Sequence, residues 1–287
     1  MAKARFAMKP LDWEDRRFKV ILFGLTGFGN VALTTLCEMG CSVQCVVTRK
    51  EIGAFPHYAE ESLVDLARKR SVIVLEGPNL NDWQLRTLFQ SLRPDLVLAS
   101  TFNRVIPKEI FSAARYAVNI HPALLPRYRG ANPFTWMLAR GEREAGLTAH
   151  LMAEKADAGE ILFQRPVPIG VNDTNGDLRY RLAKESAAMV RDIVAMCSSE
   201  QFETQPQDES RATEFARSDS DHREFFLDLR SQSENPRKVH DLIRAHLPFP
   251  GVRLLTESGD SVGVVSSHFE SGVVNIRTTE GKLILPM

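Results

Sequence analysis

An amide and an imidazole two positions apart mark the part of the sequence best suited to chemistry. Asn119 and His121 follow an apolar run and precede an irregular segment that contains Pro122, Pro126 and Pro133. In an extended strand, side chains two positions apart leave the same face, so both groups would enter one cleft. The amide can donate a hydrogen bond to an oxyanion, and the imidazole can move a proton near pH 7. The pattern indicates a catalytic site, although Asn-x-His alone is also compatible with a buried, hydrogen-bonded core histidine.

The composition is that of an ordinary soluble globular protein. The 287 residues, 44% hydrophobic and 25% charged, leave room for one large domain and a small one. Lys and Arg total 36, as do Asp and Glu, so no net charge attracts a polyanion, and Arg127 and Arg129 form the obvious local basic patch. No apolar run is long enough to cross a membrane, and the N-terminal residues are charged where a signal peptide needs an apolar core. We therefore expect a cytoplasmic location and no membrane partner.

Strands alternating with helices precede this candidate site. The strand at 18–23 has the continuous apolar character of a strand buried on both faces. The alternation predicts a parallel sheet with right-handed crossovers, whose ligands bind beyond the carboxyl ends of the strands. The loops after residues 23, 100 and 119 should meet at that edge, where the 98–107 loop is either a cleft wall or an ordinary turn. The other elements predicted before the site are strands 41–47, 71–75 and 94–100, and helices 60–69 and 82–91.

A glycine turn follows the first strand. The order G-x-x-G-x-G at Gly24, Gly27 and Gly29 differs from the dinucleotide motif G-x-G-x-x-G. Arg49 stands near the end of the second strand, where an NAD-binding protein needs an acidic residue, but an arginine would tolerate a 2′-phosphate. NAD binding is therefore disfavoured, and an NADP-binding Rossmann protein remains the rival class. Thr26 lies in this turn, which favours a polar or anionic ligand at a helix N-terminus.

Cys37, Cys41 and Cys45 have a spacing that suggests a metal site. Gly40 should end a helix between the first two, and the segment after it is a predicted strand. The thiols would then not converge, so we expect buried cysteines and no metal.

The second half of the chain predicts the end of this domain and a smaller one. Asp157 lies in an Asp-Ala-Gly turn between small residues, where a carboxylate can reach inward, although alone it is also an ordinary turn. We predict a domain at 18–200, a polar linker at 201–221 and a small β-rich domain at 222–287. The expected elements are helices 134–140, 178–196 and 237–247, the last after Pro236, and strands 147–152, 252–255, 261–266, 273–278 and 282–285.

Three features together resemble the 10-formyltetrahydrofolate-dependent formyltransferases. They are Asn119-Ile120-His121, the run from Leu124 to Gly130, and Asp157 in the context Asp-Ala-Gly-Glu-Ile-Leu. The resemblance covers residues 19–196, and more weakly 237–251. It implies a Rossmann-like α/β formyltransferase domain, a truncated OB-like C-terminal domain, 10-formyltetrahydrofolate as formyl donor, and Asn119, His121 and Asp157 as catalytic residues.

The resemblance also implies contacts to the two substrates. The arginines among them have an alternative role as structural partners of local carbonyls or acids. The implied folate contacts are Asn103, Arg104, Val105, Leu125, Ala153, Glu154, Lys155 and Ala156, and the acceptor contacts are Thr26, Arg127, Arg129 and Asn132.

The acceptor amine is a separate question, because members of the family formylate methionyl-tRNA, nucleotide-linked amino sugars or hydroxyornithine-like amines. The tRNA enzymes usually carry a basic insertion after the second strand, where this chain has only the short segment 49–55. A tRNA-binding protein should also be basic, and this chain has no net charge. We therefore expect a small-molecule amine, an amino sugar linked to a nucleotide, with methionyl-tRNA or hydroxyornithine as alternatives. Nucleic acid is a partner only in the tRNA alternative, and a homodimer is compatible with all of them.

Overall fold

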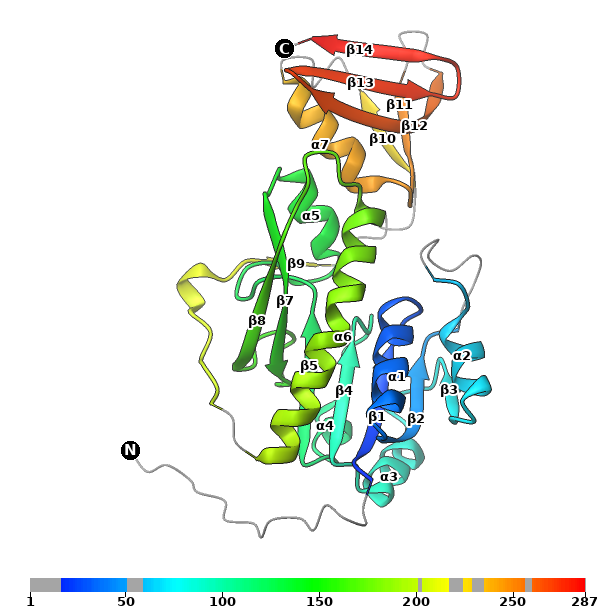
Figure 1. The fold of residues 1–287 in the computed structure, drawn as a ribbon, viewed down its shortest axis with the longest axis vertical. Coiled ribbons are helices and arrows are strands. Elements are labelled where there is room, and N and C mark those ends of the chain that lie inside the picture. Colours follow the sequence, from blue (N-terminus) through cyan, green and yellow to red (C-terminus); the bar gives the residue numbers. More distant parts are fainter. Residues whose placement is uncertain are drawn as a thin grey trace.

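The computed structural model describes residues 17–50, 59–200, 203–216, 224–228, 235–255 and 260–286. These residues form a large α/β domain and a small β-rich domain, and Figure 1 shows the small domain beyond one end of the large sheet. Most of the segment 49–55 and the predicted boundary at 221–222 lie outside the described residues. No helix in the described part of the chain combines the length and the apolar character needed to cross a bilayer.

Seven strands form the sheet of the large domain, in the spatial order β3-β2-β1-β4-β5-β7-β8. The first five are parallel, as the alternation of strands and helices predicts, whereas β7 pairs antiparallel with both β5 and β8. The loop 152–160 joins β7 to β8 and is too short for the crossover that a parallel pair requires. The strands are β1 (Lys19–Gly24), β2 (Ser42–Thr48), β3 (Val74–Glu76), β4 (Leu96–Ser100), β5 (Tyr116–His121), β7 (Glu144–Leu151) and β8 (Ile161–Pro168).

Helices cover both faces of this sheet. In β1, Val20 and Leu22 join one apolar core, and Ile21 and Phe23 join the other. The strand is thus buried on both faces, which confirms the prediction from its continuous apolar run. α1 and α6 contribute to the first core, and α3 and α4 to the second. The helices are α1 (Phe28–Glu38), α2 (Leu63–Lys69), α3 (Trp83–Leu92), α4 (Lys108–Phe111), α5 (Pro133–Ala139) and α6 (Asn175–Ser199).

The carboxyl ends of β1, β4 and β5 lie at one edge of the sheet. Gly24 pairs with Ser100, and Ser100 pairs with Ile120. The loops that follow these strands therefore emerge together, as the sequence predicts, at the edge where parallel sheets bind ligands.

Two helices begin three residues away from the start that the apolar pattern predicts, because of their caps. α2 begins at Leu63 rather than at residue 60, since the Ser62 side chain accepts a hydrogen bond from Asp65 N at 3.0 Å. α6 begins three residues earlier than predicted, because Thr174 and Asp177 form a capping box.

The polar segment predicted as a linker is bound to the large domain along its described length. We call residues 203–216 the strap. Its strand β9 (Glu214–Phe215) pairs with β6 (Arg129–Gly130), and Gln205 bridges to Ile161. Between these points lies a short 3-10 helix (Glu209–Arg211). The strap precedes the small domain in the chain, as expected of a linker, but it is bound to the large domain.

The small domain is a five-stranded sheet in the order β10-β11-β12-β13-β14, with one helix packed on it. Four of the strands and the helix lie where the sequence predicts them, and Pro236 is the first helical residue. The strand β10 was not predicted. The elements are β10 (Phe225–Asp228), α7 (Pro236–His246), β11 (Val252–Leu255), β12 (Ser261–Glu270), β13 (Val273–Thr278) and β14 (Lys282–Pro286).

Buried polar side chains of α7 join the two domains. Arg244 Nη1 donates to the carbonyl oxygens of Gly170 and Asp173, each at 3.2 Å. His240 is fully buried, its Nε2 donates to the Val171 carbonyl oxygen at 2.9 Å, and its Nδ1 lies 2.8 Å from Ser267 Oγ. Burial lowers the pKa of His240 from 6.5 to about 4, so the ring is neutral in the folded protein at pH 7.

We expect the stabilisation by His240 to disappear in mild acid. The unfolded chain takes up this proton near pH 6.5 and the folded chain near pH 4, so the contribution is complete above pH 6.5 and declines as the pH falls toward 4. The difference in Tm between the wild type and His240→Gln should therefore narrow between pH 8 and pH 5. His268→Gln, at an exposed ring of β12, is the control. A difference that stays constant with pH would contradict the prediction.

Candidate active site

Asn119, His121 and Asp157 meet beyond the carboxyl end of β5. Asp157 Oδ1 lies 3.2 Å from Asn119 Nδ2 and 3.5 Å from His121 Nδ1. Asn119 and His121 are alternate residues of β5, whereas Asp157 lies on the 152–160 loop. The structure thus brings together the three side chains predicted to be catalytic.

The Asp157 carboxylate is held in its ionised form. Its second oxygen, Oδ2, accepts a hydrogen bond from the Gly130 backbone N–H at 2.9 Å. Burial acts to raise the pKa of Asp157, but the nearby His121 and His150 rings and the Gly130 N–H outweigh it and hold the pKa well below its ordinary value. Asp157 therefore contributes a fixed negative charge at neutral pH.

His121 presents one particular nitrogen to the site. Its Nε2 lies 2.7 Å from the Tyr128 carbonyl oxygen, which can only accept, so Nε2 carries the hydrogen. In the neutral ring Nδ1 is then the proton acceptor, and it faces Asp157. Burial is the main cause that lowers the pKa of His121, and His150 adds to it, while Asp157 and the Tyr128 carbonyl oppose it. The ring is therefore neutral at pH 7, and a proton taken up at Nδ1 would face a carboxylate.

His150 is a fourth member of the site that the sequence analysis missed. It lies in β7 directly opposite Asn119, and only 2% of its surface is exposed. Its Nδ1 donates to the Leu151 carbonyl oxygen at 2.9 Å, so its Nε2 can accept from Asn119 Nδ2 at 3.0 Å. Nε2 also lies 3.6 Å from Asp157 Oδ1. The signal was a histidine within the predicted strand 147–152, but its partner became visible only with the register of β5 and β7.

Asn119 uses both hydrogens of its amide nitrogen. One is donated to His150 and the other, at 3.2 Å, to Asp157. Because the Asp157 carboxylate can only accept, the nitrogen of the amide must face it, which fixes the amide orientation.

The two segments expected to contact the folate border each other at the same edge of the sheet. An ion pair between Lys108 and Glu154 joins the start of α4 to the 152–160 loop. Arg104 and Val105 are exposed, Asn103 is half-buried, and Ala153 to Ala156 are all exposed. Leu125 differs, because it is buried and its N–H donates to Thr148 Oγ1 at 3.1 Å.

The arginines expected to contact the acceptor have protein partners. Arg127 is half-exposed and pairs with Glu142. Arg129 is 1% exposed and lies between Gln207 and Glu209 of the strap. The structure thus agrees with the alternative interpretation of Arg129 as a structural partner of local acids, and the buried guanidinium has almost no exposed surface for an acceptor.

The other two predicted acceptor contacts, Thr26 and Asn132, each lie at the N-terminus of a helix. Thr26 is buried, and its Oγ1 accepts from Leu63 N, the first residue of α2, at 2.9 Å. Asn132 has a φ of 51° and occupies the N-cap position of α5, without a capping hydrogen bond from its side chain.

The glycine turn after β1 is explained by packing. A Cβ on Gly24 would lie 2.9 Å from the Gly29 Cα, so glycine at position 24 permits a close approach of β1 to α1. Packing thus accounts for this glycine without a bound dinucleotide.

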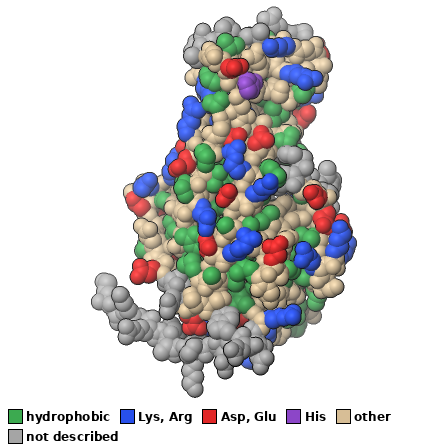
Figure 2. Space-filling model, in the orientation of Figure 1, with side chains coloured by type: hydrophobic (Ala, Val, Ile, Leu, Met, Phe, Trp, Pro, Cys, Tyr) green, Lys and Arg blue, Asp and Glu red, His purple; other side chains and the backbone are tan. Residues whose placement is uncertain are grey.

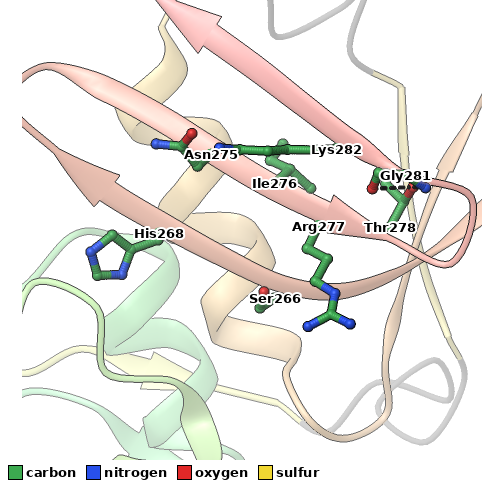
Figure 3. A pocket seen from close by; sticks show the side chains of 8 residues that line it. All are labelled: Ser266, His268, Asn275, Ile276, Arg277, Thr278, Gly281 and Lys282. Atoms are coloured by element: carbon green, nitrogen blue, oxygen red, sulfur yellow. Dashed lines mark hydrogen bonds between the residues drawn. The ribbon is translucent and has the colours of Figure 1, made fainter.

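The described residues contain no group of three His, Cys, Asp or Glu side chains that could hold a metal. A hollow of about 550 Å³ lies on the small domain. Figure 3 shows the side chains that line it, which come from β12, β13 and β14 and from the turn before β14. Its Arg277 and Lys282 side chains diverge across the sheet, and none of the predicted site residues lines it.

Comparison with known proteins gives the family. Residues 20–194 match the family model described as formyl transferase. A methionyl-tRNA formyltransferase from Halalkalibacterium halodurans is 31% identical over 236 residues, which cover 81% of this chain and 73% of that protein. The chain belongs to the formyl transferase family.

Solved structures share the fold. The N-formyltransferase from Helicobacter canadensis, in complex with folinic acid and dTDP-3-aminofucose, superposes with a TM-score of 0.69 at 18% identity, over 94% of this chain and 99% of that chain. A sugar 3N-formyl transferase, determined in the presence of dTDP and 5-N-formyl-THF, gives 0.67 at 17% identity, over 94% and 97% of the two chains. The predicted Rossmann-like domain with a β-rich C-terminal domain is confirmed.

Replacing Asp157 by Asn should lower the pKa of His121 further. The carboxylate raises that pKa, and the amide removes the charge while keeping the shape. NMR titration of isotope-labelled histidine would measure the change, with His150 resolved separately because it also faces Asp157. Glu142→Gln, which changes a carboxylate paired with Arg127, should leave the His121 pKa unchanged. An unaltered His121 pKa in Asp157→Asn would show that the two groups do not interact as described.

Proposed function

We propose that this formyltransferase moves a formyl group from 10-formyltetrahydrofolate to the primary amine of a small molecule, with Asn119, His121 and Asp157 as catalytic residues. The observation that carries the proposal is that an amide donor and a neutral imidazole both face one oxygen of the ionised Asp157 carboxylate. The folate, when bound, supplies the formyl group.

The surface between the two folate-contact segments suits a flat, partly apolar ligand. Val105 is 69% exposed although it is apolar, and Ala153 and Ala156 are exposed on the neighbouring segment. The Lys108–Glu154 ion pair lies where these segments meet. A ligand with aromatic rings would cover this apolar surface and bring its reactive end toward Asn119.

His121 acts as the proton carrier. An amine that forms a new bond to carbon becomes cationic and must lose a proton, and Nδ1 of the neutral ring is the atom that can accept it. The Nε2–H remains bonded to the Tyr128 carbonyl oxygen, so the ring keeps its orientation. Asp157 stabilises the charged ring, and the same Nδ1 later returns the proton to the departing nitrogen, which balances the reaction.

Asn119 stabilises negative charge on the oxygen of the transferred group. Both of its N–H groups are engaged, so one must be redirected. The bond to Asp157 is the longer of the two, at 3.2 Å, and Asp157 keeps its Gly130 and histidine neighbours when it is released. We therefore assign the N–H that faces Asp157 to this role.

The acceptor we propose is an amino sugar linked to a nucleotide. The N-formyltransferase from Helicobacter canadensis, in complex with dTDP-3-aminofucose, aligns over 99% of its own length. Figure 2 shows acidic and basic side chains interspersed over the face it displays, unlike a continuous basic surface for RNA. Arg127, which is 45% exposed at its side chain, is the arginine available to a diphosphate.

Methionyl-tRNA is the second candidate acceptor. It is favoured by sequence identity, which is 31% to a methionyl-tRNA formyltransferase against 18% to the sugar enzyme from Helicobacter canadensis.

A panel of acceptors would separate these candidates. The protein would be incubated with 10-formyltetrahydrofolate and, in turn, dTDP- and UDP-linked amino sugars, hydroxyornithine and methionyl-tRNA, and tetrahydrofolate release would be measured. We expect release with a nucleotide-linked amino sugar. Release with methionyl-tRNA alone would establish the second candidate, and stabilisation by NADPH but by no folate would refute the formyltransferase proposal.

Each of Asn119→Ala, His121→Ala and Asp157→Ala should reduce turnover by about a hundredfold or more, because each removes a group that acts on the reacting atoms. Circular dichroism and Tm would verify that the variants fold. Normal turnover in any two of the variants would contradict the assigned roles.

A further inference from the structure

The strap holds the backbone of the loop that carries Asp157. Gln207 Nε2 donates to the Asp157 carbonyl oxygen at 2.8 Å and to the Gly159 carbonyl oxygen at 2.7 Å. One side-chain amide therefore spans the loop from the catalytic residue to the glycine before β8.

The strap also holds the partner of the Asp157 side chain. Arg129 N donates to the Thr213 carbonyl oxygen at 2.8 Å, and Ala131 N to the Phe215 carbonyl oxygen at 2.9 Å. Between them lies Gly130, whose N–H donates to Asp157 Oδ2. A Cβ on Gly130 would collide with the Phe215 backbone, so the close pairing of β6 and β9 requires glycine there.

The orientation of Gln207 is determined by Arg129. The guanidinium, 1% exposed, donates from Nε at 3.0 Å and from Nη2 at 2.7 Å to Gln207 Oε1. The amide oxygen must face this cation, so the nitrogen must face the two carbonyls of the loop. Glu209 accepts from the same guanidinium, at 3.0 and 2.7 Å, and holds it from the other side.

The loop needs such a restraint. Asp157 has a φ of 55°, a left-handed conformation that is unfavourable for a residue other than glycine and persists when its surroundings impose it. The four residues before it, 153–156, are exposed and supply little packing. Gly159 passes so close to the Leu151 carbonyl that a Cβ would not fit.

We propose that Gln207 is a positioning residue for formyl transfer, which holds the 152–160 loop so that Asp157 Oδ1 lies between Asn119 and His121. This inference rests on the proposed function of Asp157. Gln207 acts through the backbone of Asp157 and touches neither substrate in this role, so its loss should slow the chemical step and leave binding of the acceptor amine largely intact.

Two substitutions and one control test this role. Gln207→Glu keeps an oxygen that accepts from Arg129, but it places a second oxygen, which cannot donate, against the two loop carbonyls. Gln207→Met removes both the acceptor for Arg129 and the donor to these carbonyls. Each should lower kcat about tenfold or more, with KM for a dTDP-linked amino sugar changed by less than about twofold. Glu209→Gln retains an oxygen for the same guanidinium, and should keep kcat within about twofold of the wild type.

A second measurement separates positioning from general stability. If Asp157 moves away, His121 loses the carboxylate that raises its pKa, so NMR titration should give a lower His121 pKa in Gln207→Met. His150 is titrated in the same spectra because it also faces this site. A fall in Tm that accounts for the lost activity, with the His121 pKa unchanged, would overturn the proposal.

Turnover of Asp157→Asn serves as the reference that separates the proposed role of Gln207 from the proposed function. Loss of turnover in Asp157→Asn, together with full turnover in both Gln207 variants, would refute the positioning role and leave the proposed function standing. Full turnover in Asp157→Asn would refute the proposed function itself.

Discussion

The buried charge of Asp157 is the constraint on which the rest of the site depends. An ionised carboxylate that is 14% exposed must be compensated by donors and positive charge, because transfer from water is costly. Asn119 Nδ2 faces one oxygen and Gly130 N the other, so the carboxylate binds the end of β5 to β6 across its own loop. The same charge faces Nδ1 of His121, so the carboxylate also favours a proton on that ring.

The sequence predicts the parts of this site that depend on local periodicity. The apolar run of β1 and the alternation of elements predict the sheet and its ligand-binding edge, and the spacing of Asn119 and His121 places them on one face. The contact with Asp157 spans 38 residues, and only the family resemblance indicated it. His150 could not be connected with Asn119, because its position depends on the antiparallel register of β7, which periodicity does not determine.

The strap and Arg129 show where composition is misleading. Residues 203–216 have no apolar periodicity and are predicted as a linker, yet they are held by side-chain hydrogen bonds and by the short pairing of β6 and β9. Arg129 lies in a proline-rich loop, which is a sequence context typical of a residue that binds an anion. Its burial depends on Gln207 and Glu209, which lie about eighty residues away along the chain, so its structural role becomes visible only when the strap is placed.

The strap can serve the site because other contacts join the domains. Arg244 and His240 of α7 bind the carbonyls of residues 170–173, and Asn175 Nδ2 donates to the Ala245 carbonyl oxygen at 2.8 Å. These contacts are buried and directional, so they position the small domain independently of the strap. α5 packs against α7 and begins just after Gly130, the residue that donates to Asp157. The small domain therefore packs against the helix that follows the segment of Gly130, which donates to the Asp157 carboxylate.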